Sequence, residues 1–177
     1  KILAREERLT NDGPEYPLPV RDGVGLGKAL NVMTHPLRWD LPILLGAEGP
    51  KNVALTAEIA DGWFPIFYAP QHEELYRASL DEGFARPTAR RTPDDFEIIA
   101  LANIAIDDDL AAAYDRLRPT LALYIGGMGA KEMNFHADVF RRLGYEQAVD
   151  RIQALFLDGK QNEAIAAVPD AMVDEIC

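Results

Sequence analysis

The residues best suited to bind a ligand are consecutive: Gly46, Ala47, Glu48, Gly49, Pro50 and Lys51. The apolar run 41–47 is typical of a buried parallel strand, and apolar residues at helical spacing follow over 51–60. Unpaired N–H groups at a helix start bind anions with the help of the helix dipole, and Lys51 adds a positive charge. The pattern favours an anion site here. The alternative is an ordinary strand-to-helix turn, in which Gly and Pro are common.

Two other glycine-rich segments are weaker candidates. Around Lys28, a phosphate-binding loop is excluded because Asp22 stands where its first glycine belongs and Ala29 where Ser or Thr belongs. A dinucleotide-binding fingerprint is excluded by Leu30 at its third glycine, so we interpret this segment as a surface loop. Segment 124–129 holds three glycines. It is either a loop that closes over a pocket or a helix end followed by a turn.

The sequence contains few residues suited to bind a metal or to act as a catalytic nucleophile. His35, His72 and His136 lack metal-ligand spacing, and we interpret them as solvated or capping residues. The only cysteine is the last residue, Cys177, which excludes an internal disulfide and a thiolate metal site. A serine nucleophile motif of the G-x-S-x-G type is absent. The sequence predicts no metal site and identifies no catalytic residue.

Strands and helices are expected to alternate through the middle of the chain. Apolar runs predict strands at 41–47, 63–68 and 96–106, all in buried positions. Helices are expected at 51–60 and from Pro70 to Phe84, with Asp61-Gly62 as a turn. Residues 1–40 look irregular.

The C-terminal part is expected to be helical. Asp107 to Asp109 predict a helix start, followed by an apolar stripe from Leu110 to Tyr124 in which Pro119 should kink or split the helix. Residues 131–176 predict three short helices, with Gly144 and Gly159 at helix ends and a break at Pro169.

The alternation predicts an α/β fold with a parallel sheet. Three parallel strands need neighbours, and 177 residues are short of the ~250 of a complete (βα)8 barrel. The chain is therefore either a small α/β domain with a helical tail or a segment of a barrel.

Charge and hydropathy exclude two classes of binding partner, nucleic acids and membranes. The chain has 18 Lys and Arg against 29 Asp and Glu, a net charge of −11. Such a chain repels a phosphate backbone, so we predict no nucleic-acid partner. Apolar runs stay well below the ~20 residues that span a bilayer, and the charged start is unlike a signal peptide. We predict no membrane partner and a cytoplasmic location, which the single cysteine fits.

Several segments together resemble the luciferase-like monooxygenase superfamily, in particular its actinobacterial oxidoreductases that depend on the deazaflavin coenzyme F420. The matching segments are 25–30, 46–55, 57–63, 123–129, 134–135, 143–146 and 167–170. They run in order through nearly all of the chain after residue 23.

The resemblance implies a segment of a (βα)8 TIM-type barrel, about strands five to seven, with a helical C-terminal part. Residues 1–177 would then be an incomplete part of a single barrel domain: an irregular region 1–40, βα units 41–106 and a mainly helical region 107–177. A homodimer is also implied. The family's proton-handling residues lie mostly on its early strands, so this chain alone is expected to be inactive.

The same resemblance implies hydride transfer between coenzyme F420 and a small organic substrate of unknown identity. The phosphate-bearing tail of the cofactor would lie against Gly46, Ala47, Glu48, Gly49, Pro50 and Lys51. Glu48 departs from the family pattern, because a carboxylate repels a phosphate unless it points away. Phe67, Tyr68 and Tyr124 are candidates for the substrate pocket. An FMN-dependent luciferase-like monooxygenase is the alternative enzyme, and a non-catalytic α/β interaction module is the alternative from another class.

Overall fold

The computed structural model describes residues 2–23, 27–29, 33–130 and 133–177. They divide into two compact units, Lys1–Pro42 and Ile43–Cys177, and each is described by itself. Part of the glycine-rich segment around Lys28, including Gly25 and Leu30, lies outside the described residues.

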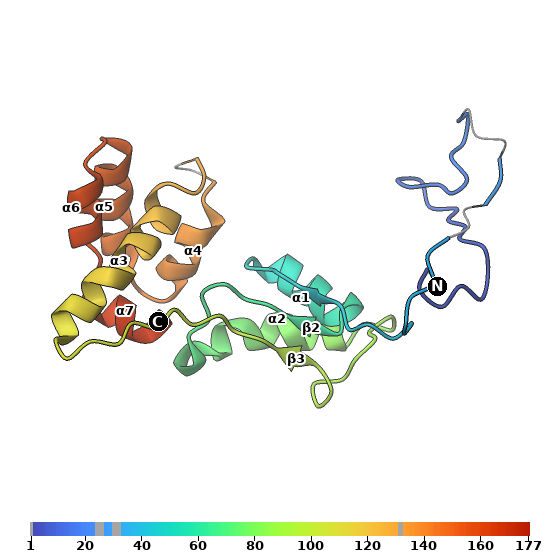
Figure 1. Cartoon of the computed structure of the whole chain (residues 1–177), viewed down its shortest axis with the longest axis horizontal. Helices are drawn as coiled ribbons and strands as arrows, with labels where there is room; N and C mark the ends of the chain where they lie inside the picture. The colour runs from blue at the N-terminus through green and yellow to red at the C-terminus, as the bar shows by residue number, and fades with distance from the viewer. Residues whose placement is uncertain (1, 24–26, 30–32, 131–132) are drawn as a thin grey trace. The chain divides into compact units, whose positions relative to one another are not determined.

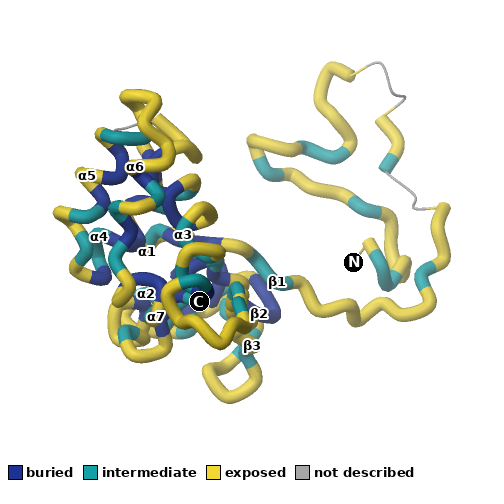
Figure 2. Tube along the Cα trace, turned by 60° about the vertical axis from the view of Figure 1, so that its left-hand side comes forward, coloured by how far each residue is buried: buried dark blue, intermediate teal, exposed yellow. Residues whose placement is uncertain are grey.

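The first unit is irregular and largely exposed, as the tube in Figure 2 shows. An isolated bridge pairs Asn11 with Leu18 through backbone hydrogen bonds of 3.0 and 2.7 Å. The Asn11 side chain closes the turn between them by donating to the Tyr16 carbonyl at 2.6 Å and accepting from the Gly13 N–H at 3.1 Å. An Asn side chain that bonds the backbone nearby is typical of such turns.

The second unit begins with a small parallel sheet in the order β1 (Leu44–Leu45), β2 (Gly62–Trp63), β3 (Glu97–Ile98) (Figure 1). Leu44 pairs with Gly62 and Gly62 with Glu97; Leu45, Trp63 and Ile98 form the next row. The predicted α/β alternation with parallel strands is confirmed. The strands are shorter than predicted because Pro42 and Pro65 flank β1 and β2 and have no N–H for a ladder.

The burial predicted for the strand 41–47 is wrong, because both residues of β1 are only half-buried and Leu41 and Ile43 before it are exposed. The prediction of a buried third strand over 96–106 is also wrong. Both residues of β3 are exposed, and Ile104 and Ile106 farther on are 78% and 89% exposed. The reason is local: among the described residues, only β2 pairs with β3, so its apolar side chains have nothing to pack against on the outer side.

Helices α1 (Pro50–Ile59) and α2 (Glu74–Phe84) follow β1 and β2, and a short 3-10 turn, η1 (Pro70–His72), precedes α2. As predicted, α1 begins with Pro50 in its first turn, after Gly49 as N-cap. The two helices pack closely where Gly83 of α2 meets Ala54 and Ala57 of α1, both fully buried.

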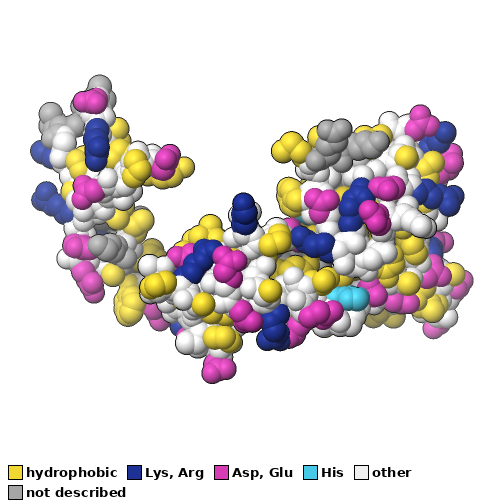
Figure 3. All heavy atoms as spheres, turned by 180° about the vertical axis from the view of Figure 1, so that it is seen from behind, with side chains coloured by type: hydrophobic (Ala, Val, Ile, Leu, Met, Phe, Trp, Pro, Cys, Tyr) yellow, Lys and Arg dark blue, Asp and Glu magenta, His cyan; other side chains and the backbone are white. Residues whose placement is uncertain are grey.

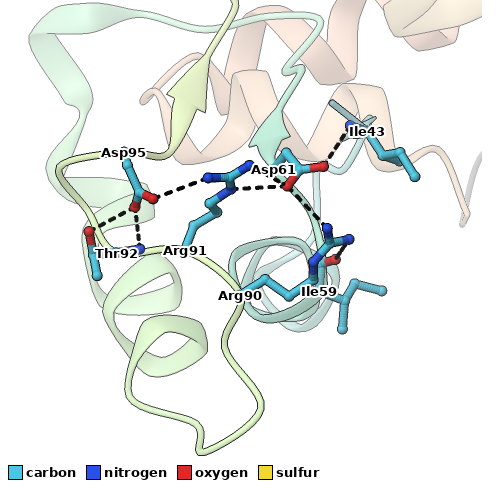
Figure 4. A network of polar contacts seen from close by, with 7 residues as sticks. All are labelled: Ile43, Ile59, Asp61, Arg90, Arg91, Thr92 and Asp95. Atoms are coloured by element: carbon cyan, nitrogen blue, oxygen red, sulfur yellow. Dashed lines mark hydrogen bonds and ion pairs between the residues drawn. The ribbon is translucent and has the colours of Figure 1, made fainter. Parts of the chain in front are cut away.

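Of the turn expected at Asp61-Gly62, Gly62 is instead the first residue of β2, while Asp61 lies in a bend just before it and is a buried anchor (Figure 4). Its carboxylate accepts from the Ile43 N–H at 2.8 Å and from the Arg91 Nε at 3.0 Å, and Arg90 lies 3.4 Å away. Burial works against the charge, but the Ile43 and Arg91 hydrogen bonds and the arginine charges outweigh it and lower the pKa of Asp61. The anchor joins β1 to the α2–β3 connection.

The C-terminal part is helical: α3 (Leu110–Gly126), α4 (Phe135–Arg142), α5 (Glu146–Leu157), α6 (Gln161–Ala166) and α7 (Asp170–Ile176). The described residues after 132 thus form four helices rather than the predicted three, although the ends at Gly144 and Gly159 are confirmed by their positive φ of 93° and 77°. Figure 2 shows buried residues along the facing sides of these helices. The largest core cluster includes Phe67, Leu121, Ile125, Phe140, Ile152 and Met172.

Helix α3 runs unbroken through Pro119, so the expected split does not occur. A proline inside a helix costs about 3 kcal/mol. Burial of Leu121 and Ile125 in the core just after it offsets that cost, because each buried side chain of this size contributes about 1.5–3 kcal/mol. The predicted start is confirmed: the Asp109 side chain accepts from the Ala111 N–H at 3.0 Å.

Candidate functional site

The predicted ligand-binding residues form one turn at the carboxyl end of β1. The segment Gly46–Gly49 links the strand to α1, with Ala47 and Glu48 buried and Lys51 exposed. In parallel α/β folds, ligands bind at this edge of the sheet. We call residues 46–51 the β1–α1 loop.

Three carbonyl groups of this loop, those of Ala47, Glu48 and Gly49, accept hydrogen bonds from the protein. The Trp63 indole N–H donates to the Ala47 carbonyl at 2.8 Å, and Arg142 Nη2 donates to the Glu48 carbonyl at 2.9 Å. The Gly49 carbonyl accepts the first bonds of α1. In contrast, the N–H groups of Ala47, Glu48 and Gly49 have no acceptor among the described residues. The loop therefore offers donors to a ligand, as an anion site does.

Neither packing nor backbone conformation requires glycine in this loop. Gly49 has φ −82° and ψ 149°, which any residue adopts, and a Cβ there would meet nothing within 4 Å. A Cβ on Gly46 would meet only the Phe64 carbonyl oxygen, at an ordinary 3.7 Å. Space beside the backbone is what these glycines provide, and a close-lying ligand uses such space.

The Glu48 side chain is turned toward the β2–α2 connection. Its Oε1 accepts from the Ile66 N–H at 3.1 Å, while Oε2 has no partner among the described residues. Burial raises the pKa of Glu48, and the Ile66 hydrogen bond and the Arg142 charge oppose that rise. The Glu48 carboxylate thus connects the β1–α1 loop to the β2–α2 connection. The backbone N–H of Glu48 remains available for a ligand.

The three aromatic candidates for a substrate pocket are divided between two clusters. Phe67 and Tyr124 meet at a ring distance of 5.1 Å, and Phe67 is fully buried. Tyr68 packs with Trp63 at 5.8 Å and Tyr76 at 5.9 Å, beside a hollow of about 110 Å³ between α2 and β3. The structure does not bring all three side chains together.

His136 is neither solvated nor a cap, so that interpretation is wrong for this residue. Its ring lies against Tyr124 at 4.9 Å and Phe135 at 4.2 Å, and its Nδ1 is buried without a partner among the described residues. The cap is Asn134, which accepts from the His136 and Ala137 N–H groups and donates to the last carbonyls of α3. Desolvation by these neighbours lowers the pKa of His136. The other two histidines differ: His35 is exposed, and His72 lies 3.6 Å from Glu175.

The lowered pKa of His136 predicts a loss of stability in mild acid. Below the unfolded-state value of about 6.5, the unfolded chain binds a proton that the folded chain resists, so the free energy of unfolding falls as pH falls. His136→Phe should reduce this dependence. Urea unfolding at about pH 7.5 and about pH 5.5 measures it. The exposed His35, changed to Phe, is the control, and an equal effect of both substitutions would contradict the assignment.

A profile of the luciferase-like monooxygenase family matches residues 2–177. The chain belongs to this family. The resemblance described from the sequence segments is therefore confirmed at the level of the family.

Curated relatives in the family include oxidoreductases. A Mycobacterium tuberculosis protein named "putative coenzyme F420-dependent oxidoreductase" is 58% identical over 177 residues, which cover 99% of this chain and 51% of that protein. A 5,10-methylenetetrahydromethanopterin reductase of Archaeoglobus fulgidus is 29% identical over 76% of this chain and 39% of its own length. An F420-dependent glucose-6-phosphate dehydrogenase of Microbacterium testaceum is 25% identical over 96% of this chain and 45% of its own length. This family member thus spans about half the length of the curated relatives it matches, or less.

A solved structure supports the fold. The coenzyme F420 dependent tetrahydromethanopterin reductase of Methanopyrus kandleri superposes with a TM-score of 0.57 at 22% identity, covering 77% of this chain and 37% of that one. The family fold seen here is α/β, with a small parallel three-stranded sheet and a helical C-terminal part.

The surface of this family member carries mixed charge. On the face in Figure 3, Lys and Arg side chains stand among Asp and Glu side chains. Within the described ranges, no helix has the length and apolar character needed to cross a membrane. The same residues contain no group of three or more His, Cys, Asp or Glu side chains that could hold a metal ion.

Proposed function

We propose that this chain is part of an oxidoreductase that transfers a hydride between coenzyme F420 and a small organic substrate. The relative named for F420 that is 58% identical over nearly the whole chain is the observation that carries the proposal. The geometry of the β1–α1 loop supports it, since free N–H groups and two glycines without a packing role suit a phosphate-bearing tail.

The proposal includes the architecture. The three parallel strands would be about the fifth to seventh of a (βα)8 barrel, with 1–177 an incomplete part of one barrel domain. Two observations support this: the outer edge of β3 is unpaired among the described residues, and the relatives are about twice as long. The homodimer implied by the family resemblance and the cytoplasmic location predicted from the sequence remain predictions.

Each part of the loop has a role in this proposal. The N–H groups of Ala47, Glu48 and Gly49, with the N-terminus of α1, would hold the phosphate, and the exposed Lys51 would add a positive charge. Gly46 would leave space beside the backbone for the ligand, and Pro50 would begin α1. The deazaflavin supplies the hydride chemistry when bound, and the protein orients it. Since the family's proton-handling residues lie mostly outside this segment, no catalytic residue is assigned.

A competitive binding titration on the complete gene product tests the proposal. Coenzyme F420 and FMN are offered together, and preference for F420 is the expected result. Preference for FMN would move the chemistry to that of a flavin-dependent monooxygenase, which the family's name keeps as the second candidate. Binding of neither cofactor, with a stoichiometric protein partner recovered instead, would favour an interaction module.

Gly49→Asp is expected to weaken cofactor binding by tenfold or more, on the order of 1.4 kcal/mol. The new carboxylate would sit at the phosphate position and repel it. Because Asp is a favoured N-cap, α1 itself should be at least as stable as in the parent. Gly49→Asn is the matched control, with the same shape and cap and no charge. Calorimetric titration measures both, and equal affinities for the Asp and Asn variants would refute this placement of the phosphate.

A further inference from the structure

A residue of the helical part hydrogen-bonds the backbone of the β1–α1 loop. Arg142, the last residue of α4, donates from Nη2 to the Glu48 carbonyl at 2.9 Å across 94 positions of sequence. Its guanidinium also lies over the Tyr76 ring, 6.0 Å from the ring centroid. A planar guanidinium with several donors can make these contacts together.

The direction of the Glu48 carbonyl determines which way the N–H group of Gly49 points. A peptide carbonyl and the N–H of the next residue belong to one planar unit and point to opposite sides. When Arg142 holds the Glu48 carbonyl toward the protein, the Gly49 N–H is turned the other way. The Trp63 indole fixes the Ala47 carbonyl in the same manner, at 2.8 Å, and so orients the Glu48 N–H.

We infer that Arg142 is a positioning residue for the cofactor: by holding the Glu48 carbonyl, it orients the loop N–H groups toward the phosphate-bearing tail. This inference rests on the proposed function. Arg142 lies on the side of the Glu48 carbonyl, opposite to the Gly49 N–H. It therefore affects the ligand through the orientation of the peptide unit between Glu48 and Gly49. It also connects the helical part to the sheet edge.

The neighbouring Arg141 provides a matched control. It has the same charge and the adjacent position on α4, but its contacts stay within the helical part: Asp150 at 2.8 Å, Gln153 at 2.9 Å and Asp138 at 3.7 Å. Arg141→Ala therefore removes equal charge from the same helix end without releasing the loop.

The test compares Arg142→Ala, Arg142→Lys and Arg141→Ala in the complete gene product, with coenzyme F420 and FMN as the titrants. We expect Arg142→Ala to raise the cofactor Kd about tenfold, the scale of one charge-assisted hydrogen bond. Arg142→Lys should recover part of the affinity because an ammonium can still reach the carbonyl. Arg141→Ala should stay within about twofold of the parent, and thermal melts show that all variants fold.

A second readout needs no ligand. The chain has two tryptophans, and the Trp63 indole N–H is bonded to the same loop, so its NMR resonance reports the loop conformation. We expect this resonance to move in Arg142→Ala and to stay in Arg141→Ala. If the parent binds a cofactor and Arg142→Ala binds it equally well with an unchanged resonance, the inference is wrong and the proposed function stands. If the parent binds neither cofactor, the proposed function fails, and a moved resonance would leave Arg142 only a structural role.

Discussion

Asp61→Ala should lower the free energy of unfolding by about 3 kcal/mol, because removing one partner of a buried ion pair leaves the others uncompensated. The Asp61 side chain is 4% exposed and accepts from the Ile43 N–H and from Arg91 (Figure 4). We take the lower end of the usual range, since Arg91 and Arg90 are themselves 38% and 53% exposed and can turn to water. Urea unfolding measures the change.

Asp95→Ala is the control for this prediction. Asp95 bonds the same Arg91, at 3.3 Å, but its side chain is 51% exposed. An exposed pair is worth about 1 kcal/mol or less. The pH dependence gives a second check: the lowered pKa of Asp61 means that its stabilisation is present above the unfolded-state value of 3.8 and is lost as pH falls through the folded value. Asp61→Ala should remove this loss, and losses of equal size in the Asp61 and Asp95 variants would contradict the anchor role.

Gly83→Ala should destabilise the chain by about 3 kcal/mol, although alanine is the better helix former by ~1 kcal/mol. A Cβ at Gly83 would lie 2.6 Å from the Ala57 Cβ and closer still to the carbonyl oxygen of Ala54. The obstacle includes main chain in the middle of α1, so relief requires α1 and α2 to separate. Overpacking of this kind usually costs about 1–3 kcal/mol, and a rigid obstacle places this site at the upper end.

Gly49→Ala is the contrasting substitution in the same pair of helices. A Cβ at Gly49 meets nothing within 4 Å, so the expected change in stability is below about 1 kcal/mol. Thermal melts of both variants decide the prediction. Loss of stability at both sites alike would show that glycine is required for backbone conformation and not for helix contact.

Local sequence signals were sufficient to predict the position of the turn at the sheet edge. Pro50 marks the start of α1, and Gly49 before it marks the N-cap, so the position of the β1–α1 loop could be predicted from a few adjacent residues. The caps at Asp109 and the positive φ of Gly144 and Gly159 depend on short-range geometry in the same way.

The features that could not be predicted from the sequence depend on contacts between residues far apart in the chain. No local pattern connects Arg142 with Glu48, since they are 94 positions apart, and an arginine in the last turn of a helix is common. Asp61 looks like a turn residue until Ile43 and Arg91 are placed around it. The Nδ1 atom of His136 became buried, and α3 continued past Pro119, through packing with segments far along the chain. For such residues tertiary contacts outweigh local propensity.

The exposed strand edge has a consequence for how this chain behaves in solution. From Ile98 to Ile106 the sequence has nine residues with no charge and no proline, and five of them are Ile or Leu. Such a segment favours pairing between molecules when it lies open. Glu97 before it and Asp107 to Asp109 after it are charges that keep copies apart, in the manner of gatekeepers. The net charge of this chain vanishes near the isoelectric point of about 4.7, and protonation of these carboxylates at still lower pH weakens their local repulsion, so acidic buffers should bring this chain out of solution through this segment first.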